Sequence, residues 1–181
     1  MKTPASVSEL SLEAVVSRFF QQSTGSWRSQ RRYYTLKEEN TQEVVSLVTI
    51  QVLEQGCDEL RQLARMHELT DEALLICGAL TTWESNYVGP SPRQTSGSTV
   101  FGVKGSQLYR DRGFSTNKPI IAQFEMRDTD TMRLRTEYSG NVFEEEIRLI
   151  GSQYRTRQTI ISRAGEEIMI GQYLETRLQN Q

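Results

Sequence analysis

Histidine and cysteine are scarce in this sequence, which excludes most familiar catalytic groups. The 181 residues include one His, His67, and two Cys, Cys57 and Cys77. His67 falls on a predicted short helix, where a lone His is usually a surface residue, so neither a Ser-His-Asp triad nor a zinc site has support. Cys77 lies in the apolar run Leu74-Leu75-Ile76-Cys77, which is typical of a core residue. We therefore expect no metal site, and any catalysis must rest on binding and orienting substrates.

Long apolar runs, glycosylation signals and an excess of positive charge are missing as well. No segment approaches the roughly 20 apolar residues that span a bilayer, and no secretory signal is visible. Two cysteines do not make a disulfide framework, so we expect a reducing, intracellular compartment. The net charge of −2 argues against a nucleic-acid binder. The 17 Arg against 4 Lys favour anionic partners, although genome composition would produce the same bias.

The chain instead contains many short segments of alternating polarity. We predict strands over 43–54, 73–87, 99–104, 118–126, 130–139, 142–150, 153–162 and 166–178. The clearest loop is 88–99, which holds two Pro and two Gly. Regular strand spacing with short turns indicates a mainly β fold, an up-and-down antiparallel barrel, in one domain that covers residues 1–181.

Two helices accompany the predicted barrel. The first covers 7–22, with Ser6 or Ser8 as its cap, and the second covers 58–67 and is capped by Asp58. Between the first helix and the first strand, a small-Gly-x-Trp turn suggests a strand that enters a closed sheet. We expect Trp27 to plug one end of the barrel, with Arg31 or Arg177 stacked on its ring.

Alternation along the last strands directs charged side chains inward. Glu145 is in phase with the apolar residues Phe143, Ile147 and Leu149, which face inward. Arg155 and Arg157 on the next strand, and Glu175 on the last, are also placed on the inward side by the alternation. Buried charges must pair with each other, face water or meet a charged ligand. Two interpretations follow: an internal Arg–Glu network that ties the strands together, or a ligand cavity in a barrel of about eight strands. Trp83 fits core packing and a cavity wall equally well.

An ordered set of motifs extends over nearly the whole chain. It opens with Phe19-Phe20 and Ser23-x-Gly25-x-Trp27-x-Ser29-Gln30-Arg31, and continues with Cys77-Gly78, Trp83 and Gly97-Ser98-Thr99-Val100. It ends with Thr136-Glu137-Tyr138, the glutamate run 144–146, Tyr154-Arg155-Thr156-Arg157 and Glu175-Thr176-Arg177-Leu178. In this order and spacing, the set resembles the S-type phycobiliprotein chromophore lyases, the CpcS/CpeS family.

The resemblance implies a lipocalin-like (calycin) barrel that binds a free phycobilin, phycocyanobilin or phycoerythrobilin, as substrate. Such enzymes attach the bilin through a thioether to a cysteine of a phycobiliprotein α or β subunit, with no tightly bound cofactor. The resemblance places bilin contacts on Arg155, Arg157 and Trp83, and catalytic roles on Glu145 and Glu175. Arginine forks suit the two propionates of a bilin. A carboxyl group would hold the pyrrole nitrogens and assist protonation, a role for which burial would raise its pKa.

Two alternatives remain open at this stage. Departures from the family pattern, such as Gln158 after the Arg-x-Arg pair, affect the pocket wall and leave the bilin undecided. In the first alternative, the chain is a partner subunit of a heteromeric lyase that acts with a paralogue, or a bilin carrier without transfer activity. A lipocalin-like binder of another apolar acid is the second alternative. A homodimer is compatible with the barrel surface, and the family would place the chain in a cyanobacterial cytoplasm or a plastid stroma.

Overall fold

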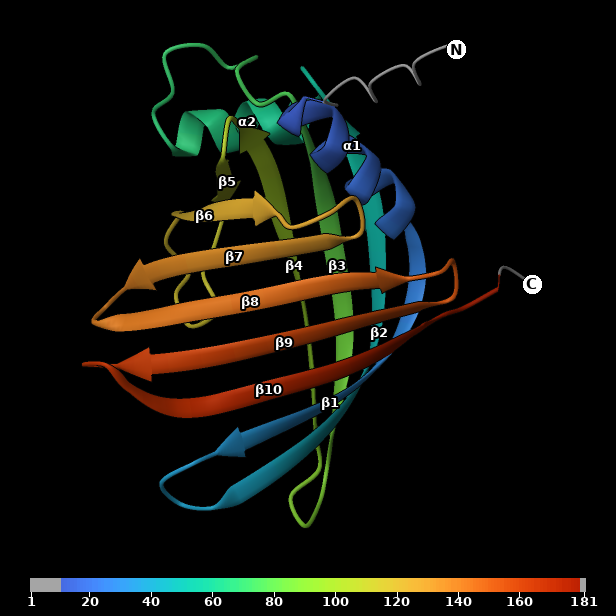
Figure 1. Cartoon of the computed structure of the whole chain (residues 1–181), viewed down its shortest axis with the longest axis vertical. Coiled ribbons are helices and arrows are strands. Elements are labelled where there is room, and N and C mark those ends of the chain that lie inside the picture. Colours follow the sequence, from blue (N-terminus) through green and yellow to red (C-terminus); the bar gives the residue numbers. More distant parts are fainter. Residues whose placement is uncertain (1–10, 180–181) are drawn as a thin grey trace, which may run out of the picture.

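The computed structural model describes residues 11–179 and forms a closed barrel of antiparallel strands (Figure 1). Each strand pairs with its neighbour in the chain, and the first strand pairs with the last to close the barrel. The strands are β1 Gly25–Thr35, β2 Asn40–Glu54, β3 Cys77–Val88, β4 Arg93–Lys104, β5 Gln107–Arg110, β6 Ile120–Met126, β7 Thr131–Tyr138, β8 Asn141–Ile150, β9 Tyr154–Arg163 and β10 Glu166–Arg177. The predicted up-and-down antiparallel barrel is confirmed. Within residues 11–179, no helix is long and apolar enough to cross a membrane.

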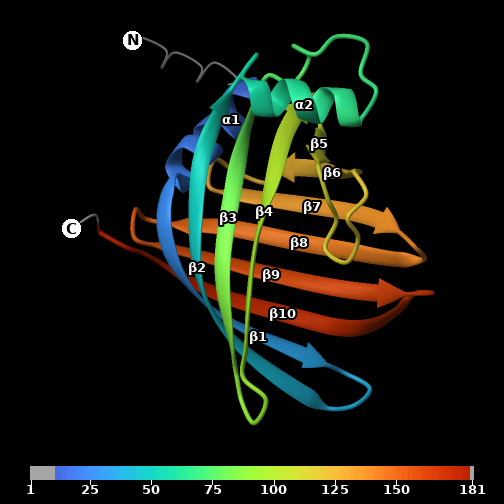
Figure 2. The same cartoon turned by 180° about the vertical axis from the view of Figure 1, so that it is seen from behind.

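The N-terminal helix α1, Leu12–Ser23, lies at one end of the barrel (Figures 1 and 2). Ser11 caps it, because its Oγ accepts a hydrogen bond from the amide of Ala14 at 3.2 Å. The predicted caps Ser6 and Ser8 lie outside the described residues. Phe19 and Phe20 pack into the barrel core with 2% and 8% of their surface exposed, so α1 covers apolar surface that the strands leave open.

The second helix α2, Asp58–Met66, packs on the outside of the barrel, against β4 and β2. The predicted inward residues Leu60, Leu63 and Ala64 are all buried, together with Leu53, Leu75 and Tyr109. The predicted cap was wrong: Cys57 is the N-cap residue, and its side chain makes no capping hydrogen bond. Asp58 is instead the first helical residue, where a carboxylate still interacts favourably with the helix dipole.

The strands differ most from the prediction around β3, β4 and β5. β3 begins at Cys77 rather than at residue 73, because Leu75 packs under α2 instead of joining the sheet. The predicted loop 88–99 is mostly strand: β4 begins at Arg93 and pairs with β3 from Tyr87 to Cys77, which leaves a short hairpin turn. β5 has only four residues and was not predicted. The barrel accordingly has ten strands, not about eight.

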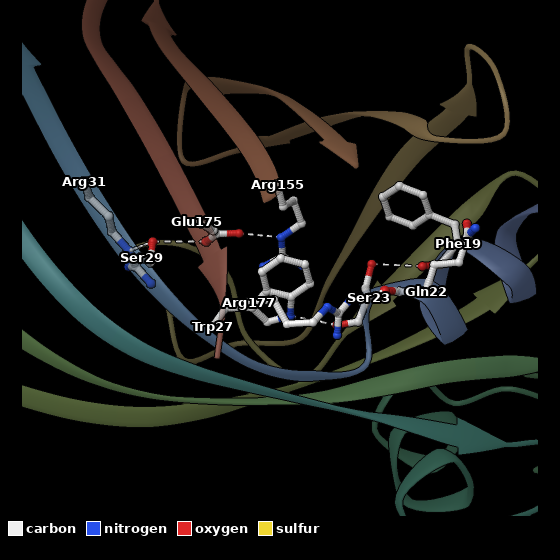
Figure 3. Close-up of polar contacts among 9 residues, drawn as sticks. All are labelled: Phe19, Gln22, Ser23, Trp27, Ser29, Arg31, Arg155, Glu175 and Arg177. Atoms are coloured by element: carbon white, nitrogen blue, oxygen red, sulfur yellow. Dashed lines mark hydrogen bonds and ion pairs between the residues drawn. The ribbon is translucent and has the colours of Figure 1, made fainter. Parts of the chain in front are cut away.

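Trp27 lies where the chain passes from α1 into the barrel, and it is fully buried (Figure 3). Its Nε1 donates to the carbonyl of Ser23 at 2.9 Å, and the guanidinium carbon of Arg177 lies 4.1 Å from its ring centroid. Arg177 also donates to the carbonyls of Gln22 and Ser152, at 2.6 and 2.7 Å. The prediction of a stacked Arg177 is confirmed, whereas Arg31 lies over Tyr173 instead. Arg177 therefore ties the C-terminal end of α1 to the β8–β9 turn.

Candidate functional site

The barrel contains a cavity of about 440 Å³. Volumes of this order suit a small-molecule ligand. Much of its wall is apolar and comes from α1 and from the inward rows of the strands: Phe19, Phe20, Val48, Ile50, Phe101, Leu108, Met132, Leu134 and Ile147. The charged residues in the wall are Arg31, Arg110, Arg112, Glu145, Arg155, Arg157 and Glu175. The cavity thus combines an apolar body with a few charged groups.

Four of the predicted site residues meet in this cavity as two ion pairs. Arg155 and Glu175 come from β9 and β10, are 7% and 1% exposed, and face each other in the register Arg155↔Glu175. Arg155 Nε donates to one carboxylate oxygen of Glu175, and the hydroxyl of Ser29 donates to the other at 3.0 Å (Figure 3). Arg31 Nε in turn donates to the Ser29 oxygen at 3.2 Å, so the pair is fixed from β1 as well.

The second pair joins Arg157 on β9 to Glu145 on β8, with 3.3 Å between Nη2 and Oε1. The side chains are 23% and 5% exposed, and the guanidinium of Arg157 lies 5.1 Å from the ring centroid of Tyr173. The buried Nε of Arg157 has no hydrogen-bond partner among residues 11–179. The predicted Arg–Glu network and the predicted cavity are therefore both present, and the ion pairs lie in the cavity wall.

The pKa direction that we expected for the two glutamates is wrong. Burial by itself raises the pKa of Glu145, but Arg157 and Arg110 outweigh it and hold the pKa below its ordinary value. Burial likewise raises the pKa of Glu175, and Arg155 then lowers it below the ordinary value. Both side chains are therefore carboxylates at neutral pH, which accept hydrogen bonds and carry negative charge.

These depressed pKa values predict that the barrel loses stability in acid. Because the unfolded carboxyl groups take up protons first as the pH falls, the stabilisation is complete above the ordinary carboxyl range and disappears below it. We expect the urea-unfolding free energy to fall as the pH drops below about 5. In E145Q, part of this pH dependence should be missing. A variant whose pH profile matches that of the original chain would contradict the assignment.

Trp83 lines the same cavity from β3, half-buried. Its partner across the β3–β4 ladder is Gly97. A Cβ at Gly97 would lie 2.6 Å from the Trp83 ring, so the glycine leaves the space in which the indole lies flat on the neighbouring strand. Trp83 lines the cavity and also packs against the buried core, so both interpretations of this residue apply. Gly97, in the segment predicted as a loop, provides the space for its ring.

The sequence reasoning missed part of the wall. Arg110, at the end of β5, and residues 112–117 of the β5–β6 loop all line the cavity. Phe114 in this loop packs on Phe143, with 5.9 Å between ring centroids, and Tyr138 stacks on Phe143 at 4.6 Å. The polar segment around β5 has no clear alternation, so no sequence signal placed these residues near β8. The lone His67 is half-buried, and its Nε2 lies 2.9 Å from the carbonyl oxygen of Arg110.

A family model described as "CpeS-like protein" matches residues 15–178. The chain belongs to the CpeS-like family. The match covers both helices from residue 15 onward and all ten strands, including every residue of the two ion pairs. The resemblance drawn from the motifs is confirmed.

Relatives and a solved structure agree with this assignment. "Putative phycocyanobilin lyase CpcS 2" of a Nostoc species is 57% identical over 166 residues, which cover 92% of each chain. "Putative chromophore lyase CpcV" of a Picosynechococcus species is 49% identical over 88% of this CpeS-like chain and 80% of that one. The S-type phycobiliprotein lyase CpeS from Guillardia theta has a TM-score of 0.78 at 22% identity, over 92% of this chain and 94% of that one. The lipocalin-like fold is therefore confirmed.

Proposed function

We propose that this CpeS-like chain is a bilin lyase: it binds a free phycobilin in the barrel and attaches it to a cysteine of a phycobiliprotein subunit. The observation that carries the proposal is the apolar cavity with two buried, ionised glutamates among arginines. A bilin has a long conjugated apolar body, pyrrole N–H donors and two propionates, so each class of cavity residue has a matching group on the ligand. Phycocyanobilin is the bilin we propose first, because the Nostoc relative is named a phycocyanobilin lyase.

The roles of the chain's own residues follow from their charge and position. The carboxylates of Glu145 and Glu175 accept hydrogen bonds from pyrrole N–H groups and stabilise a protonated bilin. Trp83 and the apolar wall hold the ring system. In the addition, the sulfur of the acceptor cysteine bonds to a carbon of a bilin double bond and the proton ends on the ring system, without a leaving group. The chain supplies orientation and charge, while the partner supplies the thiol.

Replacing Glu145 by Gln tests this function, and the next residue provides a matched control. On mixing with phycocyanobilin, we expect the original chain to shift the bilin absorption to the red and sharpen it, and then to transfer the bilin to an apo-phycobiliprotein subunit. E145Q should slow transfer about 10²-fold or more if the carboxylate assists proton movement. Glu146 is 43% exposed and pairs with Arg133 on the outer face, so E146Q should behave like the original chain.

The outcomes separate the alternatives. A shifted band without a covalent adduct would indicate a carrier or a subunit that needs a paralogous partner. No spectral change with either phycocyanobilin or phycoerythrobilin would remove the bilin-lyase proposal. Equal transfer by E145Q and the original chain would remove the role of Glu145 alone. The proposed reaction places the chain where phycobiliproteins are assembled, in a cyanobacterial cytoplasm or a plastid stroma.

A further inference from the structure

Arg110 is the last residue of β5, and the fold holds it firmly against the cavity. Along β5, Tyr109 packs outward with α2, whereas Leu108 and Arg110 line the cavity. Arg110 is 8% exposed, and its guanidinium carbon lies 5.1 Å from the ring centroid of Phe101. Its carbonyl oxygen lies 2.9 Å from Nε2 of His67, so α2 fixes the backbone at this point. The side chain is thus directed inward from an anchored position.

The residues that the structure describes leave the guanidinium of Arg110 incompletely hydrogen-bonded. Its buried Nε has no hydrogen-bond partner in the described part of the chain. Within residues 11–179, the carboxylates in the cavity form their ion pairs with Arg155 and Arg157, not with Arg110. Burial lowers the pKa of Arg110, although the charge of Glu145 opposes this effect. A buried cation without a directly paired carboxylate is costly, so a residue in this state is expected to meet an anion that residues 11–179 do not supply.

The charges of the cavity wall lead to the same conclusion. Arg110, Arg155 and Arg157 are opposed by only two carboxylates, Glu145 and Glu175. Arg31 and Arg112 also line the cavity and add to the positive side. A neutral apolar ligand would leave this excess uncompensated, whereas a ligand carboxylate would neutralise part of it through charge-assisted hydrogen bonds.

We propose that Arg110 binds a carboxylate of the ligand. Arg155 and Arg157 each pair with a carboxylate of the protein, Glu175 and Glu145, whereas no such pair forms at Arg110 within residues 11–179. Arg110 therefore takes the ligand contact that the family resemblance assigned to the Arg-x-Arg pair. If the chain binds a bilin, as proposed above, this carboxylate is a bilin propionate. The apolar wall beside Phe101 and Leu108 then receives the body of the same ligand.

Esterified ligands test the proposal directly. The original chain, R110Q and R110K are titrated with phycocyanobilin and with its dimethyl ester, which has the same ring system but no carboxylates. We expect the original chain to prefer the free acid, and R110Q to bind the free acid about 10- to 100-fold more weakly while its affinity for the ester hardly changes. R110K keeps the charge but loses the planar fork, and should fall in between.

Two controls keep the result interpretable. Arg133 lies on the outer face, 46% exposed, and R133Q should keep the original preference for the acid. Circular dichroism and unchanged ester binding show that R110Q is folded. The proposal is overturned if R110Q retains the full preference for the acid over the ester. If no bilin binds at all, the proposed function fails. The role of Arg110 is then tested by comparing the binding of laurate with that of methyl laurate. If R110Q prefers laurate over its ester as strongly as the original chain does, the role of Arg110 is overturned too.

Discussion

Glu175→Gln is expected to lower the free energy of unfolding by about 3–5 kcal/mol, because it leaves a buried guanidinium without its counter-charge. Arg155 is only 7% exposed, and the Glu175 carboxylate that accepts its hydrogen bond is 1% exposed. Ser29 would lose its carboxylate acceptor at the same time. Urea unfolding at neutral pH measures the loss. Glu144 pairs with Arg135 but is 54% exposed, so E144Q provides a carboxylate control whose stability should hardly change.

A double variant separates stability from function at this pair. Because apolar residues often replace a buried ion pair without loss, R155M/E175L should recover most of the stability that E175Q loses. Bilin transfer should stay defective in the double variant, since both charged groups have left the cavity. If R155M/E175L transfers bilin as well as the original chain does, the pair is only a structural link between β9 and β10. If it stays as unstable as E175Q, the pair contributes more than mutual neutralisation.

The period of two along long strands predicted the inner wall of the site well. Glu145, Arg155, Arg157 and Glu175 all face inward, because each lies in a strand of ten or twelve residues whose alternation keeps its phase around the site. The register shift of β10, between Glu167 and Met169, lies before Glu175 and outside this stretch. Alternation could not tell an ion-pair network from a cavity. That distinction depends on the register between β8, β9 and β10, which pairs Glu175 with Arg155.

The properties that were missed or wrong depend on contacts distant in sequence. Arg110 lies 35 positions from Glu145, and β5 is too short for a pattern to appear. The pKa direction of Glu145 was wrong because the arginines that lower it come from β9 and β5, and their proximity is visible only in the folded barrel. The β4 boundary was wrong because Gly97 and its small neighbours resemble a loop, whereas opposite Trp83 they form a ladder. Local composition predicts individual segments, whereas the groups that surround each charged side chain depend on how the sheet closes.

Trp27→Ala is expected to have an effect as large as that of Glu175→Gln, but through packing. Trp27 is fully buried, and both Arg155 and Arg177 lie over its ring, at 5.1 and 4.1 Å from the guanidinium carbon to the centroid. Removing the indole leaves a cavity at the junction of α1 and β1 and two guanidinium groups without their aromatic surface. We expect a loss of about 3–5 kcal/mol in the free energy of unfolding, measured in urea.

Two milder variants show which part of Trp27 matters. Trp27→Phe keeps an aromatic ring but leaves the Ser23 carbonyl without its indole donor, so we expect a smaller loss of about 1–3 kcal/mol. Trp83, the other tryptophan of the chain, is the matched comparison: W83F should weaken bilin binding while stability stays close to that of the original chain. A stable W27A would show that the junction repacks without the indole. If W83F destabilised the barrel as much as W27A does, the main role of Trp83 would be core packing rather than ligand binding. The apolar end of the proposed bilin site would then have to lie elsewhere in the cavity.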